Sequence, residues 1–192
     1  MSHNEMLKTI KADSYDCETG DKSNNLMFRK INEHVIGAEY HNINVYIAGS
    51  FTTPELRKEL EHMLELFNKS YPCCNIFIPM EHKVEGDYQK PDGTWNLSNP
   101  EWARRVFEMD KLHLDNAHVI YAMYTGHVGT TGTSWELGYA CAKGIPVILY
   151  IPDWVKNIDC SLMVLNGAKE YMDSKGISHP ITDEWLSQFN QK

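Results

Sequence analysis

The chain of 192 residues has no long apolar run and no excess of positive charge. None of its apolar stretches comes near the roughly 20 residues that a membrane-spanning helix needs. Its first residues, MSHNEMLKTIKADSYDCETG, lack the apolar segment of a secretory signal peptide. We therefore expect no membrane association and a cytoplasmic location. The 18 lysines and arginines stand against 26 acidic residues, and such a balance predicts no nucleic-acid partner, because a phosphate backbone needs clustered positive charge.

The number and spacing of the cysteines suggest no cross-link. The five cysteines are odd in number, and the only close pair, Cys73 and Cys74, is adjacent, so neither a disulfide framework nor a zinc site is indicated. A Walker A sequence is missing, and the glycines at Gly126, Gly129 and Gly132 do not have the spacing of the dinucleotide fingerprint. These glycines either permit a tight turn or cradle a phosphate. We expect no bound metal.

The most informative stretch runs from Val119 to Leu149. An apolar run, Val119–Met123, is followed by a loop rich in Gly and Thr, an amphipathic segment at Thr133–Lys143 and a second apolar run at Pro146–Ile151. This order predicts a βαβ unit, in which a helix connects two parallel strands. Ligands bind such units where the carboxyl ends of strands meet helix N-termini. Glu136 falls at that position, in the first turn of the predicted helix.

The rest of the chain predicts one α/β domain behind a polar N-terminal extension. Residues 1–43 form the extension and residues 44–192 the domain. Further elements are expected as a strand at Asn44–Ala48, a helix that begins at Pro54 behind the N-cap Thr53, a strand at Asn75–Pro79, a helix from Pro100 to about Asn116, a short helix at Cys160–Asn166 and a strand near Lys169–Met172. The loop Met80–Pro100 is unusually long, which is typical of either a lid or a loose insertion.

The pattern around Glu136 has two readings. Thr133-x-x-Glu136 matches a capping box, in which the carboxylate only satisfies backbone donors. A carboxylate held anionic at a helix N-terminus could instead attack an electron-poor sugar carbon in a cleft. The sequence pattern leaves both open. Tyr46 likewise is either a buried core side chain or a site residue.

Three segments together resemble the nucleoside 2-deoxyribosyltransferase family. They are NVYIAGSF from Asn44, the helix that carries Asp110, and GTTGTSWELGYACAKGIPVILYIPD from Gly129. The likeness covers about Asn44 to Gly167, and GTSWELGYA is its most specific part. It implies a flavodoxin-like three-layer α/β/α fold with a five-stranded parallel sheet. It also implies an enzyme of nucleosides and free nucleobases that needs no cofactor and forms a dimer-based homo-oligomer, up to a hexamer.

The resemblance assigns three catalytic residues. Glu136 takes the place of the nucleophile that attacks the anomeric carbon, and Tyr46 falls where a tyrosine hydroxyl holds that carboxylate. Asp110 matches the acid that protonates the departing base. The expected reaction is a double displacement through a glycosyl ester of Glu136, which transfers a 2-deoxyribosyl group from one base to another.

The resemblance also assigns a substrate pocket, with two departures from the family pattern. Gly49, Phe51 and Gly132 lie in the matched segments, and Met163 resembles a residue that the adjoining subunit lends to the pocket. Where the family usually has a sugar-binding Asp, this chain has Thr130. Ser161 stands where the neighbouring subunit usually supplies an Asn. Both changes remove strong polar contacts to the sugar, and Thr130 supplies no charge.

Two other functions therefore remain open from the sequence. If water attacks the ester in place of a second base, the same residues give an N-glycosidase of nucleosides or nucleotides. A protein that kept the pocket and lost the chemistry would be a non-catalytic nucleotide sensor. New deoxyadenosine from deoxyinosine and adenine would indicate transfer, free sugar would indicate hydrolysis, and the absence of turnover would indicate a sensor.

Overall fold

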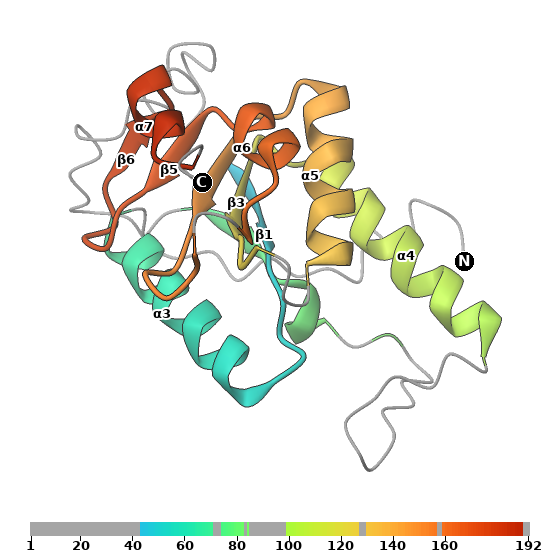
Figure 1. Cartoon of the computed structure of the whole chain (residues 1–192). Helices are drawn as coiled ribbons and strands as arrows, with labels where there is room; N and C mark the ends of the chain where they lie inside the picture. The colour runs from blue at the N-terminus through green and yellow to red at the C-terminus, as the bar shows by residue number, and fades with distance from the viewer. Residues whose placement is uncertain are drawn as a thin grey trace.

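The computed structural model describes residues 43–70, 74–82, 84, 99–126, 130–156 and 159–189 (Figure 1). The predicted extension, apart from residue 43, lies outside the described residues, as does most of the loop Met80–Pro100. The strands are β1 (Asn44–Ala48), β2 (Asn75–Phe77), β3 (Val119–Met123), β4 (Val147–Tyr150), β5 (Glu170–Met172) and β6 (Ser178–Pro180). The helices are α3 (Pro54–Ser70), the 3-10 helix η2 (Pro79–Glu81), α4 (Pro100–Asp115), α5 (Thr131–Lys143), α6 (Leu162–Gly167) and α7 (Asp183–Ser187).

These strands form one sheet in the order β2-β1-β3-β4-β5-β6. The first five strands in this order run parallel, and β6 pairs antiparallel with β5. The order 2-1-3-4-5 is that of flavodoxin-like sheets. The predicted fold is confirmed, and the sheet has one antiparallel edge strand more than the five that were expected.

Helices cover both faces of this sheet (Figure 1). On one face, α3 contributes Leu60, Met63 and Phe67 to a core with Val45 and Ile47 of β1. The other face carries α4, α5 and α6, which contribute the buried residues Leu114, Leu137, Ala140 and Leu165. Successive strand residues point to opposite faces. Tyr46, between Val45 and Ile47, is therefore directed toward α4 and α5.

The helix starts follow from local chemistry. The Thr53 hydroxyl accepts a hydrogen bond from the Leu56 amide at 3.3 Å, and the Asn99 side chain accepts one from the Trp102 amide at 3.1 Å, with Pro100 at the first helical position. None of the described helices is both long and apolar enough to cross a membrane.

The topology also fixes where a ligand should bind. From β1 the chain passes into α3 on one face, whereas from β3 it passes into α5 on the other. Neighbouring strands whose connections leave on opposite sides define a topological switch point, and ligands of open α/β sheets bind in the crevice at that point. The carboxyl ends of β1 and β3 are therefore the expected edge for a site.

Candidate active site

The centre of the candidate site is a hydrogen bond between a strand and a helix. Tyr46 of β1 donates its hydroxyl to Oε1 of Glu136 on α5 at 2.6 Å, although the two residues are 90 positions apart in the sequence. The Tyr46 side chain is fully buried. Its hydroxyl therefore holds the Glu136 carboxylate in one orientation at the switch point of the sheet.

The capping-box reading of Glu136 is wrong. Helix α5 begins at Thr131, with Thr130 as its N-cap residue, two residues earlier than predicted. Thr133 is therefore inside the helix, and Glu136 lies beyond the first turn, which contains no acidic residue. The hydrogen bond with Tyr46 directs the carboxylate toward the sheet rather than back to the start of its own helix.

Asp110 is the third residue of the candidate site, after Tyr46 and Glu136. It lies on α4, and its Oδ1 atom is buried with no hydrogen-bond partner among the described residues. Its negative charge raises the pKa of both Tyr46 and Glu136, after the larger effect of their burial. The structure thus brings together the three residues that the resemblance assigned to catalysis.

Burial sets the protonation of both carboxyl groups. It raises the pKa of Asp110 to about 7. The pKa of Glu136 also rises to about 7, because burial and then the charge of Asp110 outweigh the lowering by the Tyr46 hydrogen bond. One of the two readings of the sequence had the helix dipole keep Glu136 anionic. Desolvation dominates instead, so each of the two groups can carry a proton near neutral pH.

The neighbouring Asp115 shows how differently an exposed carboxylate behaves on the same helix. It receives hydrogen bonds from Lys111 at 2.6 Å and from the Tyr139 hydroxyl at 2.6 Å, and it pairs with Lys143 at 3.1 Å. These contacts, the one to Lys111 first, hold the pKa of Asp115 well below its usual range. Asp115 is thus permanently ionised, whereas Asp110 can carry a proton at neutral pH.

The glycines and the phenylalanine assigned to the pocket lie at the ends of β1 and the start of α5. A side chain at Gly49, directly after β1, would place its Cβ 3.0 Å from Leu60 and 3.2 Å from Met123, so these neighbours would have to shift by a few tenths of an ångström to admit it. The Phe51 carbonyl accepts a hydrogen bond from the Arg57 side chain at 2.8 Å. Gly132 is exposed near the start of α5, with open space around it.

The two residues that depart from the family pattern, Thr130 and Ser161, both form hydrogen bonds within the chain. The buried Thr130 donates its hydroxyl to the Gly126 carbonyl at 2.6 Å. The Ser161 amide donates to the Tyr124 hydroxyl at 3.0 Å. Met163, on α6, is 85% exposed, so this chain does not bury it against its own Tyr46–Glu136 pair.

A group of stacked rings lies beside this pair; sequence reasoning considered His82 for the base pocket but missed Phe77 and His113. Phe77 of β2 lies with its ring centroid 5.4 Å from that of Tyr46, and the imidazoles of His82 and His113 both stack on Phe77. One signal was present: His113 follows Asp110 by three residues, which places both on one face of a helix. The spacing alone could not show that this face meets Phe77.

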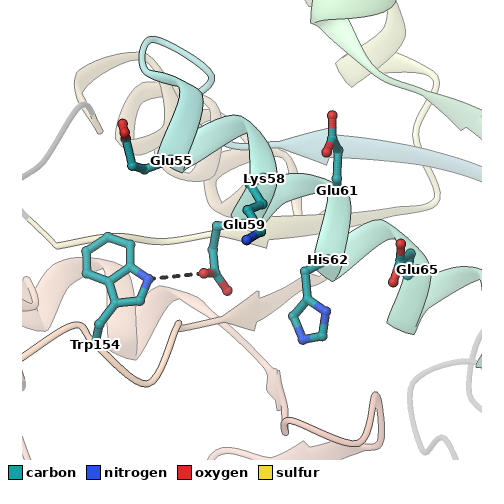
Figure 2. A pocket seen from close by; sticks show the side chains of 7 residues that line it. All are labelled: Glu55, Lys58, Glu59, Glu61, His62, Glu65 and Trp154. Atoms are coloured by element: carbon teal, nitrogen blue, oxygen red, sulfur yellow. Dashed lines mark hydrogen bonds between the residues drawn. The ribbon is translucent and has the colours of Figure 1, made fainter.

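A separate groove follows the outer surface of α3, away from these residues. It is lined by Trp154 and by polar side chains of the helix: Glu55, Lys58, Glu59, Glu61, His62 and Glu65. Figure 2 shows the Trp154 indole facing Glu59, which accepts its hydrogen bond at 3.1 Å. Glu59 also accepts the Tyr150 hydroxyl at 2.7 Å. In the part of the chain that the structure describes, no group of three or more His, Cys, Asp or Glu side chains could hold a metal ion.

Comparison with known proteins identifies the family. The family model described as nucleoside 2-deoxyribosyltransferase matches residues 45–175. A nucleoside deoxyribosyltransferase of Lactobacillus johnsonii is 26% identical over 118 residues, which cover 61% of this chain and 78% of that protein. The solved 2-deoxyribosyltransferase from Bacillus psychrosaccharolyticus shares the fold, with a TM-score of 0.52 and 23% identity over 72% of this chain and 98% of that one. The match includes Tyr46, Asp110 and Glu136, and the chain belongs to the nucleoside 2-deoxyribosyltransferase family of enzymes, as the sequence predicted.

Proposed function

We propose that this protein transfers a 2-deoxyribosyl group between nucleobases by double displacement through an ester on Glu136. The observation that carries the proposal is the 2.6 Å hydrogen bond from the buried Tyr46 hydroxyl to Glu136, with the carboxyl group of Asp110 beside it. A positioned nucleophile and a carboxyl group that can hold a proton near neutral pH are the two groups that this reaction needs. Family membership supports the same activity.

In the first step, a Glu136 oxygen forms a bond to the anomeric carbon while the bond from that carbon to the base nitrogen breaks. The electron pair of the broken bond goes to the base, which takes a proton from Asp110. The transition state resembles an oxocarbenium ion. A 2-deoxy sugar favours it, because it has no electron-withdrawing oxygen beside the anomeric carbon. Asp110 must therefore start protonated and Glu136 ionised.

In the second step, a nitrogen of the incoming base attacks the anomeric carbon and Glu136 departs as a carboxylate. Asp110, ionised by the first step, takes the proton that the incoming base loses. Two displacements at one carbon give overall retention of configuration. Tyr46 stabilises the Glu136 carboxylate whenever it is free, because it donates to the charged oxygen.

The second candidate is hydrolysis, in which water attacks the ester. Thr130 favours this reaction. Its hydroxyl donates to the Gly126 carbonyl, and its side chain brings no charge to the sugar. Incubation with deoxyinosine, with and without adenine, separates the two by chromatography. Transfer gives deoxyadenosine only when adenine is present. Free deoxyribose formed at the same rate without adenine would establish the hydrolase and contradict the transferase.

We also propose that the working form is a homo-oligomer in which a neighbouring copy lends Met163 and Ser161 to the pocket. Met163 is 85% exposed and Leu162 beside it is 52% exposed. Large apolar side chains exposed together are typical of interaction surfaces. Light scattering in solution measures the number of subunits, and a monomer at assay concentration would contradict this proposal.

Replacement of Tyr46 by phenylalanine is expected to lower kcat about tenfold, because it removes a hydrogen bond to a charged group and leaves the ring in place. The Tyr46 hydrogen bond lowers the pKa of Glu136, so its loss raises that pKa. The acid limb of the pH–activity profile should therefore move to higher pH. Tyr150→Phe is the matched control, since its hydroxyl donates to Glu59 on α3. An unmoved acid limb in Tyr46→Phe would contradict the assignment.

Asp110→Asn should stabilise the fold at high pH. An aspartate in the unfolded chain titrates at about 4, whereas burial raises the folded pKa to about 7. At a pH between these two pKa values, unfolding releases a proton from Asp110. Asp110 therefore lowers the free energy of unfolding more and more as the pH rises from 4 to 7, and by a constant amount above 7. The Tm of the variant minus that of the wild type should be at least about 2 °C greater at pH 8 than at pH 4. Equal differences at both pH values would contradict a raised pKa.

A further inference from the structure

The ring cluster of Phe77, His82 and His113 borders the candidate site directly. Phe77 is the register partner of Tyr46 in the neighbouring strand. The His113 ring stacks on Phe77 with centroids 3.6 Å apart and an interplanar angle of 8°, and the His82 ring does so at 4.4 Å and 13°. An aromatic wall therefore continues from the Tyr46–Glu136 pair along the carboxyl end of β2.

His113 carries a buried ring nitrogen that the fold does not use. Its Nε2 atom has no hydrogen-bond partner in the described part of the chain, and the same is true of Oδ1 of Asp110, one helical turn earlier on α4. Leaving a buried polar atom unpaired destabilises a fold. Two such atoms lie on one face of one helix, one on Asp110, whose charge acts on Glu136, and one on His113, which stacks on Phe77. They mark a place where the polar edge of a ligand would satisfy both.

The charge of His113 restricts what that ligand can be. Burial, and then the neighbouring His82, lower the pKa of His113 to about 4. The imidazole is therefore neutral at physiological pH, and Nε2 either donates or accepts one hydrogen bond according to the tautomer. A neutral, adaptable partner beside aromatic rings suits a flat heterocycle better than a phosphate or a carboxylate.

We propose that His113 is a nucleobase-contacting residue, whose Nε2 hydrogen-bonds the edge of the base while Asp110 exchanges a proton with it. The proposal rests on the proposed function, since it places the base of the substrate between Asp110 and the ring cluster. Nε2 is out of reach of solvent, so the surrounding rings shift as the base enters. Because its two tautomers interchange, His113 accommodates either a keto oxygen or an amino group on the base.

The decisive variant is His113→Phe, which keeps a flat ring against Phe77 and removes the nitrogens. Its dissociation constant for adenine and for hypoxanthine, measured by calorimetry on the whole chain, should rise about 3- to 10-fold, as expected for one hydrogen bond. In turnover, KM for the base should rise by the same factor while kcat stays within about twofold. His113→Gln, which can place a polar atom near the same point, should recover most of the affinity.

The control is His62→Phe, the same change on the exposed surface of α3, which should leave both constants unchanged. The Tm of His113→Phe should equal or exceed that of the wild type, because an unpaired buried nitrogen is removed. A variant that unfolds, or one that binds both bases as the wild type does, would overturn the inference. A wild type that binds neither base would also overturn it.

Base binding and chemistry can be separated with the Glu136→Gln chain. If the His113→Phe change weakens base binding in that chain too, the inference stands even where no turnover is seen and the proposed function fails. Turnover of nucleosides together with base affinity that does not depend on His113 would remove the inference alone.

Discussion

Replacement of Glu136 by glutamine should lower the rate of deoxyribosyl transfer by about a thousandfold or more, because the amide cannot form the glycosyl ester. Glutamine has nearly the same shape and keeps an oxygen that can accept the Tyr46 hydrogen bond, which measures 2.6 Å in the wild type. The fold and the binding of bases should therefore persist. Chromatography of deoxyinosine and adenine mixtures measures the rate, and calorimetry measures base binding.

The chain offers a closely matched control for this change. Glu59 accepts a tyrosine hydroxyl at 2.7 Å, as Glu136 does, but lies on α3 across the sheet. Glu59→Gln should therefore leave the transfer rate within about twofold of the wild type, as is usual for a change outside the reacting groups. If Glu136→Gln kept a tenth or more of the wild-type rate, Glu136 would not be the nucleophile.

Replacement of Asp110 by asparagine should lower kcat by about 10²- to 10⁴-fold, the usual contribution of a positioned general acid. The wild type needs Asp110 protonated and Glu136 ionised, and the pKa of each group is about 7. Activity should thus fall as the pH rises above neutral and also as it falls below, which gives a bell-shaped profile. Initial rates across this pH range measure it.

The pH–activity profile of Asp110→Asn further tests the assignment of Asp110 as the general acid. In Asp110→Asn the alkaline limb should disappear, because no acid remains to be lost. The acid limb should remain close to its wild-type position, because Asp110 is protonated on that side of the profile and, like asparagine, carries no charge there. Asp115→Asn, on the exposed side of α4, should keep both limbs. An Asp110→Asn profile with the wild-type alkaline limb would assign that limb to another group.

Much of the fold followed from local patterns. The strands β1 and β3 have the predicted bounds, because each is a short apolar run between polar segments, and the starts of α3 and α4 are fixed by Thr53 and Asn99 caps. The edge strand β6, Ser178–Pro180, has no such run. Only its pairing with β5 forms it, and a contact of that kind cannot be found from local spacing.

The site was less accessible to pattern reasoning. The start of α5 was placed two residues late, which made Glu136 look like part of a capping box. Tyr46 and Asp110 were assigned through the family resemblance, because their proximity to Glu136 depends on how β1, α4 and α5 pack. The charge state of Glu136 was misjudged for the same reason: desolvation depends on tertiary burial, whereas the helix dipole can be inferred from local sequence.

The central claim is that Glu136 bonds covalently to the anomeric carbon during turnover. Its most direct test is mass spectrometry of the whole protein after incubation with deoxyinosine and no acceptor base, followed by peptide mapping. We expect a fraction of the protein to carry one deoxyribosyl group on Glu136, lost when adenine is added and absent in Glu136→Gln. A wild-type protein that turns over deoxyinosine without this adduct, or that carries it on another residue, would contradict the account.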